Sequence, residues 1–130
     1  MNEYRILVVD DEEDLCEILK FNLENEGYEV DTANSAEDAL KMDISTYDLL
    51  LLDVMMGEIS GFKMASMLKK EKKTAQIPII FITAKDTEND TVTGFNIGAD
   101  DYISKPFSLR EVAARVKAVL RRTRQTETER

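Results

Sequence analysis

Four short apolar runs in this chain are each followed by residues that can handle a phosphoryl group. In chain order these residues are Asp10 and Asp11 after 6–9, Asp53 after 49–52, Thr83 after 79–82, and Lys105 shortly after 102–103. If the runs are neighbouring parallel strands, these side chains meet at one edge of the sheet, where open α/β sheets bind their ligands. The chain has no histidine, so any histidine chemistry must come from a partner.

Clustered carboxylates at that edge predict a site for a divalent cation. Neighbouring carboxylates either raise one another's pKa or hold a cation. Oxygen ligands without histidine or cysteine favour Mg²⁺ or Mn²⁺ over zinc. We expect Asp11 and Asp53 as direct ligands with the backbone carbonyl of Met55 as a third, and Asp10 acting through water.

The open positions of such an ion suit a phosphoryl oxygen, and an aspartate beside it can act as nucleophile. Lys105 and the Thr83 hydroxyl would help to neutralise the phosphoryl oxygens. Taken alone, Lys105 would be read as a solvated surface charge and Thr83 as a turn residue. Their occurrence together at consecutive strand ends favours the chemical interpretation.

Composition points to one globular domain. The chain has 130 residues, of which 43% are hydrophobic and 33% charged, enough for a real core. Its net charge of -9 argues against nucleic-acid binding by this domain itself. Cys16 is the single cysteine, which excludes an internal disulfide and fits a cytoplasmic location. We see no apolar stretch of membrane-spanning length and expect no membrane partner.

Strand and helix patterns alternate along the chain. Strands are predicted at 5–9, 28–32, 48–52, 78–82 and 101–103, and helices at 12–26, 36–42, 61–72, 87–97 and 108–122. This alternation implies right-handed crossovers and a parallel sheet. We therefore predict a single flavodoxin-like α/β domain with a five-stranded sheet of order 2-1-3-4-5 and helices on both faces. That order is preferred because it places Asp10 and Asp11 beside Asp53.

Two local patterns add detail. The first helix carries an apolar stripe, which consists of Leu15, Ile18, Leu19 and Leu23. From Arg121 onward no apolar residue remains to be buried, so 122–130 is predicted to begin a linker after a domain at 1–121.

Longer motifs resemble a known family. They are Val8-Val9-Asp10-Asp11-Glu12, Asp53-Val54-Met55-Met56 with Gly61-Phe62, Pro78-Ile79-Ile80-Phe81-Ile82-Thr83-Ala84, and Gly98-Ala99-Asp100-Asp101-Tyr102-Ile103-Ser104-Lys105-Pro106-Phe107. Together they resemble the receiver domain of a two-component response regulator over nearly the whole chain.

The resemblance implies specific roles. Asp53 would accept a phosphoryl group from a phosphohistidine on a sensor histidine kinase, with Mg²⁺ bound by Asp11, Asp53 and the Met55 carbonyl and with Asp10 in the acidic pocket. Lys105 would contact the phosphoryl group through a loop with a cis Lys105-Pro106 bond, and Thr83 and Tyr102 would form a switch pair. Tyr102 would turn inward on phosphorylation. Such a domain is not an enzyme, because it catalyses only its own phosphorylation and dephosphorylation.

The last helix most resembles the subfamily that carries a winged-helix DNA-binding output domain. The chain does not include that output domain. DNA binding is expected only through it. Phosphorylation would repack the face formed by residues 87–122, control transcription and allow a homodimer. The interface residues that match the subfamily are Asp101, Arg115, Glu111 and Lys117, with Val92 and Phe95 as apolar contacts; Thr91 and Asn96 replace two expected partners. At most one of the usual three charge pairs, Asp101 with Arg115, would then remain.

Three alternatives stay open. The chain could be a stand-alone receiver that acts through protein partners. It could be a Mg²⁺ phosphatase with an aspartate nucleophile, although Met55 occupies the position where such enzymes place a general acid. It could also be an inert module whose acidic residues only solvate loops.

Overall fold

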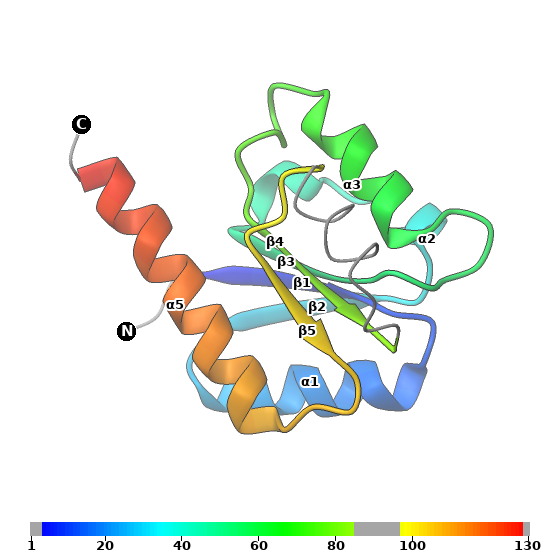
Figure 1. The fold of residues 1–130 in the computed structure, drawn as a ribbon, viewed down its shortest axis with the longest axis horizontal. Coiled ribbons are helices and arrows are strands. Elements are labelled where there is room, and N and C mark those ends of the chain that lie inside the picture. Colours follow the sequence, from blue (N-terminus) through cyan, green and yellow to red (C-terminus); the bar gives the residue numbers. More distant parts are fainter. Residues whose placement is uncertain (1–3, 85–96, 129–130) are drawn as a thin grey trace.

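The fold is a parallel sheet covered on both faces (Figure 1). The computed structural model describes residues 4–84 and 97–128, with side chains up to Thr123. The strands are β1 (Arg5–Val9), β2 (Glu29–Ala33), β3 (Leu49–Asp53), β4 (Ile79–Thr83) and β5 (Asp101–Ser104). All pairings are parallel, in the order β2-β1-β3-β4-β5. The predicted strand order is therefore confirmed.

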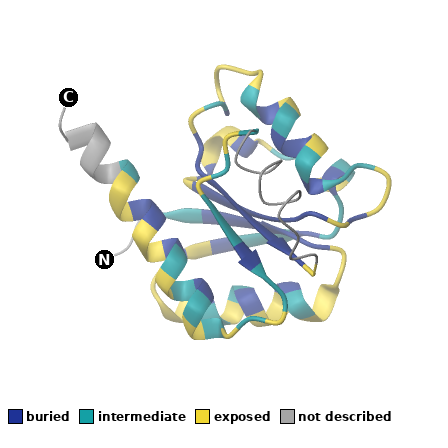
Figure 2. Cartoon of the chain, viewed as in Figure 1, coloured by how far each residue is buried: buried dark blue, intermediate teal, exposed yellow. Residues whose placement is uncertain are grey.

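Successive side chains of a strand point to opposite faces of the sheet, so alternate residues of the strands pack into two separate cores. One core packs under α1 (Glu13–Asn25) and α5 (Leu109–Thr128), and the other under α2 (Ala36–Leu40) and α3 (Gly61–Lys69). Every residue of β3 and β4 is buried (Figure 2). Because these strands are covered on both faces, their first four residues are all apolar with no polar alternation, and each strand ends in one buried polar residue, Asp53 or Thr83.

Helix α1 buries most of the predicted stripe, with one residue exchanged. Cys16, Leu19 and Leu23 are buried against the sheet, whereas Ile18 is 49% exposed. Each residue turns an α-helix by about 100°, so Ile18 lies a quarter-turn away from Leu19. The predicted stripe was wrong in including Ile18 and in passing over Cys16.

Helix α5 continues through Thr128, past the predicted end near residue 122. Its last buried apolar residue is Leu120. The residues beyond it are mostly charged or polar, and arginine, glutamine and glutamate favour helix without needing a core. Loss of the apolar stripe therefore marked the end of the buried face and not the end of the helix.

Serine caps begin α2 and α5 as the sequence predicted. The hydroxyl oxygen of Ser35 accepts from the N–H of Asp38 at 3.0 Å, and that of Ser108 accepts from the N–H of Glu111 at 3.0 Å. A short 3₁₀ turn at Ile44–Thr46 was not predicted. The helix expected at 87–97, with Thr91, Val92, Phe95 and Asn96, lies outside the described residues except for its last residue.

Within 4–84 and 97–128, no helix combines the length and apolar character needed to cross a lipid bilayer.

Candidate functional site

Three carboxylates meet where β1 and β3 end. Val9 and Leu52 are register partners on these adjacent strands, so the residues that follow them, Asp10 and Asp53, come side by side. One oxygen from each of Asp10, Asp11 and Asp53 lies within 4.8 Å of the other two. The carboxylates that the sequence placed at one sheet edge therefore converge.

The cluster is buried on one side and open on the other. Asp10 and Asp53 are 1% and 3% exposed, whereas Asp11 is exposed. Asp10 also shapes the local backbone, because one of its oxygens accepts the N–H of Glu12 at 2.9 Å just before α1 begins. Solvent and ligands therefore reach the pocket from the Asp11 side.

Lys105 reaches into this cluster from the loop after β5. Its ammonium nitrogen lies 3.3 Å from Asp10 Oδ2 and 3.7 Å from Asp53 Oδ1. The backbone N–H of Lys105 donates to the carbonyl of Thr83 at 2.7 Å, and the Lys105-Pro106 bond is cis, as the resemblance implied. These contacts tie the β5 loop to the end of β4 and aim the ammonium at the acids.

Burial and charge shift the pKa values of Asp53, Asp10 and Lys105. Burial, with a contribution from the neighbouring Asp10, raises the pKa of Asp53 to about 7. Burial also raises the pKa of Asp10, although the Glu12 N–H and Lys105 oppose this. Burial disfavours the Lys105 ammonium, but the two carboxylates outweigh it and raise the pKa of Lys105.

The donor set fits a divalent cation. It consists of hard carboxylate oxygens within reach of one another, and one lysine supplies the nearby positive charge. Such ligands suit Mg²⁺, which usually takes one or two carboxylates and keeps open positions for water or phosphate oxygens. The Met55 side chain is exposed in the loop after Asp53, and its carbonyl as a further ligand stays a prediction.

Thr83 and Tyr102 lie near the site on β4 and β5. Thr83 is fully buried and directly follows Ile82, the register partner of Asp53. The Tyr102 ring meets Phe81 edge-on at 6.3 Å between centroids, and its hydroxyl oxygen is buried. The ring is partly buried against the core here, and its movement on phosphorylation stays a prediction.

Gly61 has a structural role that the sequence motif did not explain. It begins α3, and its N–H donates to the carbonyl of Val54 at 3.0 Å. A Cβ at this position would overlap the carbonyl oxygen of Asp53. Only glycine allows the start of α3 to pack directly on the backbone that carries Asp53.

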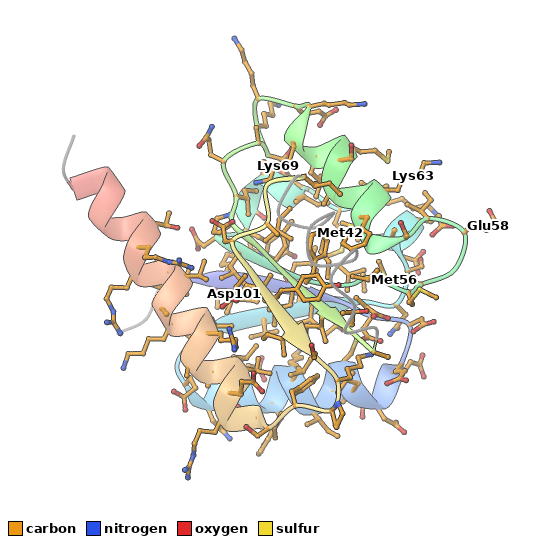
Figure 3. All side chains as sticks on the ribbon, in the orientation of Figure 1. Met42, Met56, Glu58, Lys63, Lys69 and Asp101 are labelled. Atoms are coloured by element: carbon orange, nitrogen blue, oxygen red, sulfur yellow. The ribbon has the colours of Figure 1, made fainter. Side chains whose placement is uncertain are left out.

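The expected interface charges pair within one chain. Arg115 donates to both oxygens of Asp101 at 2.9 and 3.1 Å, and to Glu111 at 3.1 Å. Asp101 begins β5 on the side of α5 (Figure 3), and Lys117 is exposed on α5. A dimer that paired Asp101 of one subunit with Arg115 of the other would first have to break this pair within each chain.

Sequence reasoning missed two residues behind the site. The Cys16 thiol and the Asn34 side-chain amide both donate to the backbone carbonyl of Asp10, at 3.3 and 3.2 Å. Burial raises the pKa of Cys16 to about 11, so the thiol stays protonated. No motif marks either residue, because the contact joins separate segments of the chain.

Comparison with known proteins places this geometry in a family. A family model described as the response regulator receiver domain matches residues 6–117. The chain belongs to this family. A solved relative, a CheY-like response regulator receiver domain protein from Methanospirillum hungatei JF-1, superposes with a TM-score of 0.88 at 29% identity, over 96% of this chain and 99% of that one.

Two longer relatives share the receiver region. The chain is 50% identical over 120 residues to the alkaline phosphatase synthesis transcriptional regulatory protein PhoP of Bacillus subtilis (strain 168), covering 92% of this chain and 49% of PhoP. It is 46% identical over 125 residues to the transcriptional regulatory protein SrrA of Staphylococcus aureus (strain NCTC 8325 / PS 47), covering 95% of this chain and 51% of SrrA. This receiver chain thus spans about half the length of the curated relatives it matches.

Proposed function

We propose that this receiver accepts a phosphoryl group on Asp53 from a sensor histidine kinase and acts as a phosphorylation-controlled switch. The observation that carries the proposal is the nearly buried Asp53 carboxylate, with Asp10 and Asp11 within 4.8 Å and the Lys105 ammonium at 3.7 Å. Membership of the receiver family supports it.

The metal in this proposal is Mg²⁺. Asp11 and Asp53 would hold it with the Met55 carbonyl, and Asp10 would act through a water. When bound, the ion would supply positive charge to the oxygens of the transferring group. The exposed Asp11 side of the pocket supports this assignment, because it leaves room for a partly hydrated ion.

Three residues of the chain then have separate roles in the transfer of the phosphoryl group. A carboxylate oxygen of Asp53 attacks phosphorus, the O–P bond forms, and the P–N bond breaks with its electron pair left on the imidazole of the kinase. Lys105 neutralises charge on the phosphoryl oxygens, and the Thr83 hydroxyl donates a hydrogen bond to one of them. The chain promotes only its own phosphorylation and its own dephosphorylation.

The output of the switch is control of transcription through a winged-helix domain beyond this chain. The names of PhoP and SrrA as transcriptional regulatory proteins support this, as does their greater length. Thr83 and Tyr102 would couple Asp53 to the face formed by residues 87–122, through which the phosphorylated chain would form a homodimer. Thr83 ends β4 and Tyr102 lies on the paired strand β5, which is part of this face.

Intact-mass spectrometry after treatment with acetyl phosphate tests the proposal. With Mg²⁺ the chain should gain one phosphate, and Asp53→Asn or an excess of EDTA should abolish the gain. Asp38→Asn, which alters an exposed carboxylate on α2, is the matched control and should be phosphorylated like the wild type. A phosphate that persists in Asp53→Asn would contradict the proposal.

A further inference from the structure

The peptide that joins Asp10 to Asp11 is held by two side chains. Its carbonyl oxygen accepts from Cys16 Sγ at 3.3 Å and from Asn34 Nδ2 at 3.2 Å. The Asn34 amide also lies 3.7 Å from the Cys16 sulfur. The two donors and the carbonyl therefore form one compact group next to the carboxylate cluster.

This group connects three separate segments of the fold. Cys16 lies in α1 and is 2% exposed, and Asn34 directly follows β2. The N–H of Asp10 donates to the carbonyl of Ala33 at 3.1 Å, next to Asn34 in the chain. The Asp10 N–H is thus bonded to the last residue of β2 and the Asp10 carbonyl to the residue that follows it, and the thiol adds a link to α1.

Holding this carbonyl restrains the backbone from which the Asp11 side chain projects. A peptide unit is planar, so the carbonyl of Asp10 and the N–H of Asp11 move together. Asp11 is exposed, so packing contributes little to its orientation. The bonds to the preceding carbonyl orient the backbone from which this carboxylate projects.

We propose that Cys16 and Asn34 are positioning residues that set the affinity of the Asp10–Asp11 pair for a divalent cation without touching the ion. This inference rests on the proposed function, because it assumes that the carboxylate cluster binds Mg²⁺. Outer partners that orient metal ligands typically change metal affinity by about 10- to 100-fold when removed.

Calorimetric titration with Mg²⁺ tests the inference on the whole chain. Cys16→Val replaces the thiol donor with an apolar side chain that is one heavy atom larger, and Asn34→Ala removes the amide from a half-buried loop position. Each should raise the Mg²⁺ dissociation constant by about tenfold. The rate of phosphorylation by acetyl phosphate at saturating Mg²⁺ should stay within about twofold of wild type, because the reacting groups are unchanged.

Two further variants separate positioning from general loosening. Cys16→Ser restores a donor and should recover most of the lost affinity. Leu19→Val shortens a fully buried side chain on the same face of α1 and should lower the free energy of unfolding with no change in Mg²⁺ affinity. If Cys16→Val fails to fold, Asn34→Ala carries the test alone.

The outcomes are distinguishable. Absence of saturable Mg²⁺ binding by the wild type would overturn the proposed metal site and the inference with it. Wild-type binding with unchanged affinity in folded Asn34→Ala and Cys16→Val would overturn the inference alone. Leu19→Val weakening Mg²⁺ binding as much as Cys16→Val, at a similar loss of unfolding free energy, would also overturn it.

Discussion

At Asp53 the folded state favours the protonated carboxyl group. Burial and the neighbouring Asp10 raise its pKa from 3.8 to about 7. Between these two pH values the folded chain binds more protons at Asp53 than the unfolded chain does. The stabilisation is therefore complete below pH 3.8 and is lost as the pH rises to about 7. Above that pH the folded chain holds an unfavourable charge.

Asp53→Asn should therefore stabilise the apo protein at alkaline pH. We expect the free energy of unfolding in EDTA to rise by about 2 kcal/mol at pH 8, because the buried charge is removed. The gain should shrink at about pH 5, where the wild-type carboxyl group is already protonated in the folded state. Urea denaturation at both pH values checks this, with the exposed-site variant Asp38→Asn as control. Equal gains at both pH values would contradict it.

Lys105 partly balances the charge of Asp10 and Asp53. Lys105→Met keeps much of the side-chain volume but leaves the two buried carboxylates without this cation. The free energy of unfolding at pH 8 should fall by about 2 kcal/mol, and phosphorylation by acetyl phosphate should slow by at least about tenfold. Lys63→Met, on the exposed side of α3 (Figure 3), should change neither quantity. A normal phosphorylation rate in Lys105→Met would remove Lys105 from the proposed chemistry.

The carboxylate cluster could be predicted from the positions of its residues after apolar runs. The side chains that hydrogen-bond to its backbone could not. Asp10, Asp11, Asp53 and Lys105 each follow an apolar run, and the strand order brings them together. The bonds from Cys16 and Asn34 depend on the packing of α1 against the segment after β2, which no local pattern encodes. The direction of the Tyr102 ring depends in the same way on its packing against Phe81.

At the scale of elements, Gly61 lets α3 pack directly on the backbone that carries Asp53. Gly61→Ala would push the first turn of α3 away from Asp53, since the added carbon overlaps a backbone oxygen. We expect a loss of about 2 kcal/mol in unfolding free energy, together with slower phosphorylation.

Gly57→Ala is the matched control for that variant. Gly57 lies in the same loop, has a φ of 34° and has nothing within 4 Å of an added Cβ. Its cost should be about 1 kcal/mol, from the backbone conformation alone, with the phosphorylation rate preserved. Denaturation curves and phosphorylation rates for both variants check the comparison, and equal phosphorylation rates in the two would contradict the role given to Gly61.

The elements themselves were largely predictable, and the differences have physical causes. Strands β3 and β4 were recognisable because burial on both faces makes them continuously apolar. The end of α5 was misplaced because charged residues with good helix propensity extend a helix without a buried face. The face of α1 was misread because a small thiol at Cys16, and not Ile18, faces the sheet.

For the whole molecule, a bound cation should couple the site to global stability. A ligand present at 100 times its dissociation constant stabilises the folded state by about 2.7 kcal/mol. We expect that gain in unfolding free energy for the wild type with Mg²⁺. We expect a much smaller gain for Asp11→Asn, which removes a proposed ligand. Thermal or urea unfolding with and without Mg²⁺ measures the gain in unfolding free energy for each protein. An equal gain in the wild type and in Asp11→Asn would mean that Mg²⁺ binds outside the carboxylate cluster.

The most direct test of the account is a crystal structure of the chain with Mg²⁺ and beryllium fluoride, which mimics a phosphoryl group. The account predicts beryllium bonded to a carboxylate oxygen of Asp53, one Mg²⁺ contacting both Asp11 and Asp53, and the Lys105 ammonium on the fluorides. Beryllium bound to another residue, or a Mg²⁺ held without Asp11 and Asp53, would contradict it.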